Sequence, residues 1–255
     1  MKLDKILAVR KGKTVYRDGD VAIKVYDESY SKADILNEAL NQARIEETGL
    51  AIPKILEVGT VDGKWALALE YIEGKTLASL MEEHPERLDE YWDLFVSLQE
   101  QVHSKKVPLL TTLKDKMIRK ISYSELVATV RYDLQMKLRE MPGPSHLCHC
   151  DFSPSNILIR EDGVPFIIDW SHATQGYPCV DAAITYILFL LSGNTQSAEK
   201  YLTLFCEKSG FDRDSVLKWV PVAAASKSIK TEGERKKNLL SLANTVEYKN
   251  GGMIS

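Results

Sequence analysis

The sequence predicts an α+β fold in which a small β-rich part precedes a larger, mainly helical part. Short apolar runs separated by turn signals fill roughly the first seventy residues. Helical spacing of apolar residues dominates after Gly74. A chain of 255 residues with 44% hydrophobic content can build a sizeable core in one or two domains. We therefore expect two parts, an N-terminal part over residues 1–72 and a C-terminal part over residues 73–255.

The N-terminal part is expected to be an antiparallel sheet with one inserted helix. Turn signals separate five strand-like runs, which cover residues 6–10, 13–17, 20–26, 54–61 and 64–72. A helical pattern occupies residues 29–49, with Ser29 or Ser31 as its cap and Gly49 at its end. The Asp-Gly pair at 62–63 is a strong hairpin signal. The prediction is a five-stranded sheet with a helix after the third strand.

The C-terminal part is expected to be helical apart from one hairpin. Apolar residues recur at helical spacing in four segments, residues 76–84, 86–104, 110–121 and 123–141. Two short strand-like runs over residues 156–169 are joined by a Glu-Asp-Gly turn. Helices with brief loops are expected from about residue 180 to residue 246, and residues 248–255 are expected to fray.

Composition and charge exclude several classes of partner. The formal net charge of −3 gives no reason to expect nucleic acid as a partner. The start of the chain lacks an apolar stretch of signal-peptide length. The longest apolar run, residues 182–191, is about half as long as a membrane span requires. We expect a cytoplasmic protein that binds no membrane, with its four cysteines as reduced, mostly buried thiols rather than zinc ligands. The sequence contains no signal for an oligomeric state.

Three polar residues around the expected hairpin point to phosphoryl transfer. Asn156 and Asp169 lie at its two ends, so folding of the hairpin brings their oxygens near one point. Mg²⁺ prefers oxygen ligands and keeps few protein ones, because phosphate and water supply the rest. Asp151 lies on the loop that enters the hairpin and can face the same point without being a ligand.

The spacing of these residues resembles the aminoglycoside phosphotransferase and choline kinase-like family. The pattern is His149-x-Asp151-x-x-x-x-Asn156, followed thirteen residues later by Asp169 in Ile-Asp-Trp. The resemblance implies a protein-kinase-like, two-lobe fold. It also implies that Asp151 is the catalytic residue, that Asn156 and Asp169 bind Mg²⁺, and that His149 supports the loop. The expected activity is transfer of the γ-phosphate of ATP to a hydroxyl group.

The resemblance extends to the nucleotide-binding part. Lys24 stands in "VAIK", as in the kinase pattern, and is expected to reach the α- and β-phosphates. Glu38 is the best candidate for its glutamate partner, with Glu46 and Glu47 as alternatives. The carbonyl of Glu70 and the amide of Ile72 are expected to hold adenine.

The first hairpin lacks the glycine-rich GxGxxG cradle. Its candidates for phosphate contact are Gly12, Thr14 and Lys13, and Lys13 is equally well explained as a solvated turn residue. ATP is the expected nucleotide, and GTP fits the same pattern. Two further residues, His103 and Asp181, resemble family positions with structural roles, Asp181 as the buttress of the catalytic loop.

A small hydroxylated molecule is the expected acceptor. Only eleven residues separate Asp169 from Asp181, and the loop reads "HCD" rather than "HRD", so the docking features of protein kinases are missing. An atypical protein kinase and a nucleotide-binding scaffold without catalysis remain alternatives. Retention of Asp151, Asn156, Asp169 and Lys24 argues against the scaffold.

The acceptor can be aminoglycoside-like, amino alcohol-like or sugar-like. Its pocket is expected between the helical insert, residues 76–141, and the C-terminal helices. Residues 226–237 carry five basic side chains against two glutamates, which does not suit a polycation, although a solvated helix face explains the run better. A choline site needs an aromatic cage. The available rings are Tyr91, Trp92, Tyr123, Tyr132 and Trp170.

Overall fold

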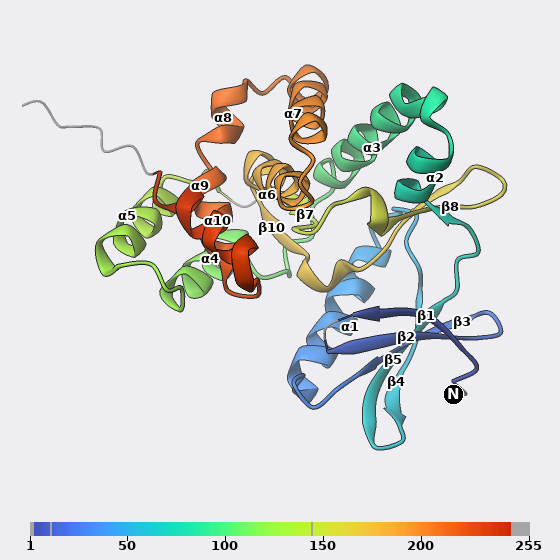
Figure 1. Ribbon diagram of the computed structural model, residues 1–255. Coiled ribbons are helices and arrows are strands. Elements are labelled where there is room, and N and C mark those ends of the chain that lie inside the picture. The colour runs from blue at the N-terminus through green and yellow to red at the C-terminus, as the bar shows by residue number, and fades with distance from the viewer. Residues whose placement is uncertain (1–2, 11, 144, 246–255) are drawn as a thin grey trace, which may run out of the picture. The chain divides into compact units, whose positions relative to one another are not determined.

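The computed structural model describes residues 3–10, 12–143 and 145–245 (Figure 1). The chain divides into two compact units. Unit 1 consists of Met1–Leu110 and Asp151–Ala173, and unit 2 consists of Thr111–Cys150 and Thr174–Ser255. These units are not the expected parts 1–72 and 73–255, and that division stays a prediction. The tail expected to fray, residues 248–255, lies outside the described residues.

Unit 1 contains the predicted five-stranded antiparallel sheet, in the order β1-β2-β3-β5-β4. Its strands are β1 (Lys5–Arg10), β2 (Lys13–Asp18), β3 (Val21–Tyr26), β4 (Ile55–Val61) and β5 (Lys64–Glu70). The register places Lys24 of β3 opposite Val15 of β2 and Leu67 of β5. Lys24 therefore lies on a central strand, with a neighbour on each side.

Helix α1 (Lys32–Glu46) follows the third strand, as predicted, and lies against the sheet (Figure 1). Ser31, one of the two expected caps, begins it through a capping box with Asp34. The buried apolar residues shared by helix and sheet are Tyr26, Ile35, Ala39, Leu67 and Leu69. The packing turns the Glu38 side chain inward, where it is buried.

The remainder of unit 1 supports a second, small sheet of order β6-β8-β9. Its strands are β6 (Lys75–Thr76), β8 (Ile157–Ile159) and β9 (Pro165–Ile167), and helices α2 (Leu77–Glu83) and α3 (Leu88–His103) follow β6. Gly74 precedes β6, and a Cβ atom there would lie 2.3 Å from the carbonyl oxygen of Ile159. Only glycine allows this close approach of the two backbones.

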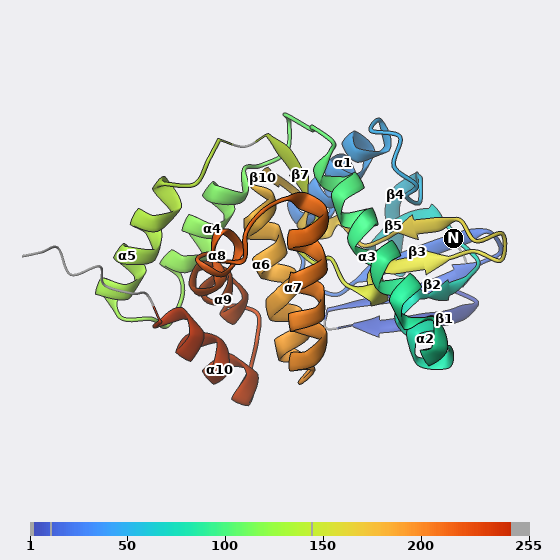
Figure 2. The same cartoon turned by 90° about the horizontal axis from the view of Figure 1, so that it is seen from above.

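Unit 2 is mainly helical, as the sequence predicts. Its helices are α4 (Leu113–Ser122), α5 (Ala128–Arg139), α6 (Pro178–Leu191), α7 (Thr195–Ser209), α8 (Arg213–Leu217), α9 (Val220–Ser228) and α10 (Gly233–Ala243). The apolar run expected to be a buried helix is α6, which packs against α7 and α9 (Figure 2). Strands β7 (His146–Cys148) and β10 (Thr174–Gly176) form an antiparallel pair that the sequence does not predict.

The predicted α+β class is confirmed, since an antiparallel five-stranded sheet is combined with a mostly helical remainder. Within the described residues, no helix has both the length and the apolar character needed to cross a membrane.

Candidate active site

The predicted hairpin is present and brings Asn156 and Asp169 to the same end. Ile157 pairs with Ile167 across β8 and β9. Beyond that pair, the Ile168 N–H donates to the Asn156 carbonyl at 2.9 Å. The turn closes at Gly163, whose φ of 82° lies in the left-handed region that favours glycine. Both expected metal ligands therefore leave one short ladder at adjacent positions.

The Asp169 carboxylate is the centre of an ionic network. It accepts from Lys13 Nζ at 3.1 Å on each oxygen, and from Lys24 Nζ at 3.1 Å on Oδ1. The Ser171 hydroxyl donates to Oδ1 at 3.1 Å. Burial alone would raise the pKa of Asp169, but Lys24 and Lys13 outweigh burial and hold that pKa far below its usual range. Asp169 is therefore an anion across the physiological pH range.

Lys24 also pairs with Glu38, as expected. Lys24 Nζ lies 3.0 Å from Glu38 Oε1, and the side chains are only 9% and 7% exposed. Burial alone would lower the pKa of Lys24, but Asp169 and Glu38 outweigh it and raise that pKa above its ordinary value. The alternative Glu46 instead accepts from the Ile55 N–H at 2.8 Å. A buried ammonium group is thus fixed between two carboxylates from different elements.

Lys13 is a member of this network that the sequence leaves undecided. Its side chain is 11% exposed and contacts Asp169, so it is not a solvated turn residue. On β2, Lys13 and Val15 project to one face, and Val15 lies opposite Lys24. The sequence signal for Lys13 is the alternation of side chains along β2, which puts Lys13 and Val15 on one face. This signal becomes useful only when the pairing of Val15 with Lys24 is known.

The other two phosphate candidates of the first hairpin occupy different positions. Thr14 projects to the opposite face of β2 from Lys13, opposite Val25. Gly12 has a φ of 80°, and its carbonyl accepts from the Asp27 N–H at 2.9 Å. The structure does not bring the Thr14 side chain to Asp169, and the phosphate contacts of Gly12 and Thr14 stay predictions.

Asp151 is tied to Asn156. Asn156 Nδ2 donates to the Asp151 backbone carbonyl at 2.8 Å and lies 3.4 Å from Asp151 Oδ2. The next residue, Phe152, is fully buried, and its ring lies 4.8 Å from that of Phe95 in α3. These contacts anchor the loop, so that Asp151 has a fixed position beside Asn156.

The oxygen atoms at the end of the hairpin are suitable ligands for a Mg²⁺ ion. The amide nitrogen of Asn156 is the hydrogen-bond donor toward Asp151, which leaves its amide oxygen as a ligand atom. The Asp169 carboxylate adds anionic oxygens. One carboxylate and one amide oxygen form the small, hard ligand set that Mg²⁺ uses when phosphates complete its shell.

Asp181 supports the segment that leads into this loop, as expected. Within unit 2, its carboxylate accepts from the Cys150 N–H at 2.7 Å and from the His149 N–H at 3.3 Å. Cys150 has a φ of 62°, which is unfavourable for a residue with a side chain. Asp181 is fully buried and fixes this conformation, which agrees with its expected structural role.

The expected adenine-binding segment is held at its backbone. The Tyr71 N–H donates to the Asp20 carbonyl at 2.9 Å, and the Glu70 N–H donates to the Lys54 carbonyl at 2.8 Å. Among the groups that the structure describes, the Ile72 N–H donates to none. The backbone around Ile72 therefore has a fixed direction and a donor for a ligand.

The five aromatic residues that were candidates for a choline cage differ in their burial. Tyr91, Trp92 and Trp170 are buried, and Trp170 Nε1 donates to the Ile167 carbonyl at 2.9 Å. Tyr123 and Tyr132, on unit 2, are 79% and 62% exposed. Burial makes the first three part of the core.

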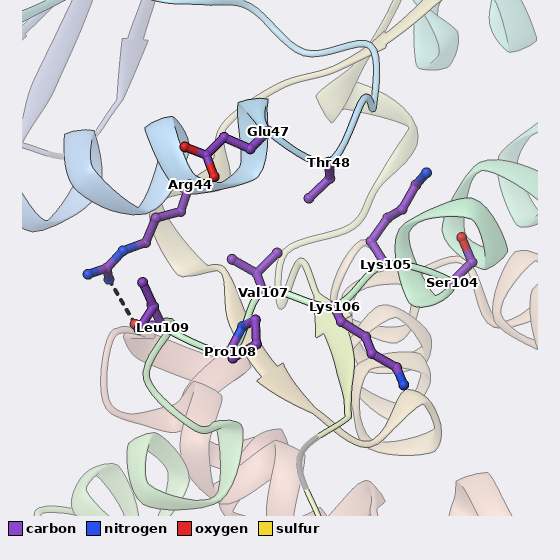
Figure 3. Close-up of a pocket in the computed structure, with 9 residues that line it drawn as sticks. All are labelled: Arg44, Glu47, Thr48, Ser104, Lys105, Lys106, Val107, Pro108 and Leu109. Carbon is purple, nitrogen blue, oxygen red and sulfur yellow. Dashed lines mark hydrogen bonds between the residues drawn. The ribbon is translucent and has the colours of Figure 1, made fainter.

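A surface pocket of about 490 Å³ lies in unit 1, and none of the residues of the ionic network lines it (Figure 3). It is formed by the end of α1 and the segment after α3, and its lining residues are Arg44, Glu47, Thr48, Ser104, Lys105, Lys106, Val107, Pro108 and Leu109. Of the glutamates considered for Lys24, only Glu47 lines this pocket, and Lys24 pairs with Glu38 instead.

Comparisons with known proteins agree with this geometry. Residues 10–218 match APH, described as the phosphotransferase enzyme family. A search of curated proteins finds no match.

Solved structures with the same fold are known. A thermostable mutant of aminoglycoside phosphotransferase APH(4)-Ia, in ternary complex with AMP-PNP and hygromycin B, has a TM-score of 0.70 and 16% identity, covering 94% of this chain and 91% of that chain. Choline kinase LicA from Streptococcus pneumoniae has a TM-score of 0.65 and 16% identity, covering 96% of this chain and 94% of that chain. At such identity these likenesses establish the fold.

Proposed function

This chain belongs to the phosphotransferase enzyme family, and on that premise we propose that it transfers the γ-phosphate of ATP to a hydroxyl group of a small molecule. The observation that carries the proposal is the ionic network of Lys24, Glu38 and Asp169, with Asn156 beside Asp169 on the hairpin. Phosphoryl transfer needs a fixed cation for the phosphates, oxygen ligands for a metal and a group that orients the acceptor. Each need has a candidate residue in unit 1.

The residues divide this work by their positions. Lys24 binds the α- and β-phosphates, and Glu38 holds its ammonium group in place. Asn156 and Asp169 are the residues that would hold Mg²⁺, which supplies positive charge to the phosphate oxygens when bound. Asp151 orients the acceptor hydroxyl and accepts its proton as the new oxygen–phosphorus bond forms. The bond between the γ-phosphorus and the β–γ bridging oxygen of ATP breaks in the same transfer, and ADP leaves with that oxygen.

The adenine ring is assigned to the segment around Glu70. The N–H of Ile72 would donate a hydrogen bond to the edge of the ring, and the carbonyl of Glu70 would accept one from it. Backbone recognition of this kind depends little on side-chain identity, so GTP remains a second nucleotide for the assay.

The related structures support the proposal that the two substrates are ATP and a small hydroxylated molecule. One holds AMP-PNP, an ATP analogue, together with hygromycin B, and another is a choline kinase. An aminoglycoside-like, amino alcohol-like or sugar-like acceptor is consistent with them.

The test is a coupled ADP-release assay over aminoglycosides, amino alcohols, sugars and hydroxy acids. With a turned-over acceptor, Asp151→Asn should reduce kcat by roughly 10²- to 10⁴-fold, the scale of a general base. Calorimetry should still show nucleotide binding by that variant. Asp169→Ala should abolish Mg-ATP binding.

The matched control is Asp162→Asn, an exposed aspartate in the turn of the same hairpin. It should keep the wild-type rate and nucleotide affinity. Full turnover by Asp151→Asn, or unchanged Mg-ATP affinity of Asp169→Ala, would contradict the proposed roles.

A further inference from the structure

The hydroxyl group of Tyr26 is a buried polar group that the chemistry above does not use. Tyr26 is the last residue of β3, and it is only 1% exposed. Among the groups that the structure describes, none forms a hydrogen bond with its hydroxyl oxygen. A buried hydroxyl without a partner costs free energy, and native proteins satisfy most groups of this kind. The Tyr26 hydroxyl therefore requires an explanation.

The register of the sheet places Tyr26 beside both lysines of the ionic network. Lys24 is two residues earlier on β3, so the two side chains project to the same face of the sheet. Lys13 of β2 is the cross-strand partner of Tyr26. Side chains that are directly opposite in an antiparallel pair share a face, with Cβ atoms about 5 Å apart. Tyr26 thus lies at the border of the ionic network.

Helix α1 brings Glu38 to the same place. Tyr26 packs in one apolar cluster with Ile35 and Ala39 of α1. Glu38 follows Ile35 by three residues and directly precedes Ala39, so it shares the buried face of the helix. Among the charged groups that act on the Tyr26 hydroxyl, the Glu38 carboxylate acts most strongly. The phenol and the carboxylate therefore lie close together between the helix and the sheet.

The Tyr26 hydroxyl is available as a hydrogen-bond donor. Burial, together with the negative charges of Glu38 and Asp169, raises the pKa of Tyr26 far above its ordinary value. The phenol therefore keeps its proton throughout the physiological pH range.

Glu38 has the capacity to accept this proton in a hydrogen bond. Its Oε1 accepts from Lys24 Nζ at 3.0 Å, and this is its one hydrogen bond in the described part of the chain. A carboxylate has two oxygens with about four lone-pair sites in total. A donor and an acceptor, both buried and both with unused capacity, are thus neighbours in the core.

Binding of Mg-ATP would change which groups hold Lys24. Its ammonium group contacts Asp169 at 3.1 Å as well as Glu38. Under the proposed function, Asp169 binds Mg²⁺ and Lys24 binds phosphate, so the contact between Lys24 and Asp169 weakens. Glu38 is then the carboxylate that fixes Lys24. A group that holds Glu38 in place favours nucleotide binding, because an ammonium group that is already fixed loses less freedom when it binds.

We infer that Tyr26 is a positioning residue for the nucleotide: in the Mg-ATP complex its hydroxyl donates a hydrogen bond to Glu38, which holds Lys24 against the phosphates. The inference rests on the proposed phosphotransferase function and adds a residue to it. Hydrogen bonds to a charged acceptor are roughly twice as strong as those between neutral groups. The bond would therefore increase the affinity for Mg-ATP.

Tyr26→Phe tests the inference, because it removes the hydroxyl and keeps the ring. The Kd of Mg-ATP, measured by calorimetry, should rise about tenfold, the scale of one lost hydrogen bond to a charged group. KM for ATP should rise with it, and kcat should change less. Without nucleotide, the thermal unfolding midpoint should equal or exceed that of wild type, because the removed hydroxyl has no partner among the described groups.

The matched control is Tyr16→Phe, the same substitution on the neighbouring strand. Tyr16 is half-buried on β2 and is the cross-strand partner of Ile23, so it projects to the opposite face of the sheet from Lys24. Tyr16→Phe should keep the wild-type Kd of Mg-ATP and the wild-type KM for ATP.

A second experiment tests whether Tyr26 acts through Glu38. The Kd of Mg-ATP is measured for Glu38→Gln and for the double variant Tyr26→Phe/Glu38→Gln. Because the neutral amide accepts a weaker hydrogen bond, Tyr26→Phe should raise the Kd by a smaller factor in the Glu38→Gln background than in wild type. An equal factor in both backgrounds would overturn the role through Glu38.

The outcomes separate the inference from the proposed function. If wild type binds Mg-ATP and releases ADP, an unchanged Kd in Tyr26→Phe would overturn the inference and leave the proposed function standing. A lowered unfolding midpoint with an unchanged Kd would assign Tyr26 to stability alone. Absence of both Mg-ATP binding and ADP release in wild type would instead refute the proposed function, and the inference with it.

Discussion

Two ammonium groups from neighbouring strands contact one carboxylate in the candidate site. Lys24 is shared between Asp169 and Glu38, whereas Lys13 has Asp169 as its contact. If ATP binds at the proposed site, its triphosphate brings several negative charges there, and Lys13 would gain a second class of partner. We propose that Lys13 supplies positive charge to the phosphates where a glycine-rich loop would supply backbone N–H groups.

Replacement of Lys13 tests this role. Lys13→Gln should raise KM for ATP about tenfold, because it removes one charge-assisted contact to phosphate, and should change kcat less. Initial rates against ATP concentration measure the effect. Lys5→Gln, an exposed lysine on β1, is the control and should retain the wild-type KM. A KM for ATP in Lys13→Gln equal to that of wild type would assign Lys13 to stability alone.

At the residue scale, the sequence predicts contacts correctly for residues that stand at a fixed spacing in a recognisable pattern. Lys24 and Glu38 are paired as predicted, and Asn156 meets the end of β9 as the hairpin requires. Lys13 is different, because its use depends on which face of β2 it occupies. That face is set by the pairing of β2 with β3, and a one-residue slip would reverse it.

At the scale of elements, the hairpin that carries Asn156 is held to α2 by β6. The two residues of β6 pair with β8, and Gly74 lets the chain approach the β8 backbone. The position of Asn156, a proposed metal ligand, therefore depends on a glycine outside the hairpin. The sequence marks Gly74 as a boundary, and only the packing reveals its steric role.

Gly74→Ala should destabilise unit 1. The new methyl group would meet the Ile159 carbonyl, and overpacking of this kind costs about 1–3 kcal/mol of the free energy of unfolding. Urea unfolding followed by circular dichroism measures the change. Gly143→Ala is the control, since open space surrounds that position and its φ is not positive. Equal midpoints for Gly74→Ala and wild type would show that the backbone relaxes at no cost.

The pair of β7 and β10 illustrates what sequence cannot supply for elements. Each strand has three residues, too few for an alternating pattern to be read. Their partner positions, such as Cys148 and Thr174, are 26 residues apart in the chain. The pairing exists because both segments enter the core of unit 2 at the same place.

At the scale of the whole molecule, neither compact unit is one continuous piece of chain. The backbone passes between the units after Leu110, after Cys150 and after Ala173. The second of these points lies directly before Asp151, the proposed catalytic residue, so the segment that contains it is divided between the two units. Composition changes only once along the sequence and cannot predict three such crossings.

Ligand binding should stabilise the whole chain if the proposed nucleotide site is correct. At a concentration about 100 times its Kd, Mg-ATP should raise the free energy of unfolding by about 2.7 kcal/mol. Thermal unfolding with and without Mg-ATP measures the shift. Removal of Mg²⁺ with EDTA should reduce it, and Asp169→Ala should lose it. A shift of full size in Asp169→Ala would contradict metal binding by that carboxylate.

The sequence by itself determined the fold class, the five strands with their inserted helix, and the family pattern around Asp151. These features depend on local periodicity and on fixed spacing between residues, which survive in a linear chain. Only the tertiary structure decided that Lys13 contacts Asp169, that Gly74 lies against β8, and that α4 packs against α9. Each of these requires segments distant in sequence to meet, and packing of the two cores decides which side chains do so.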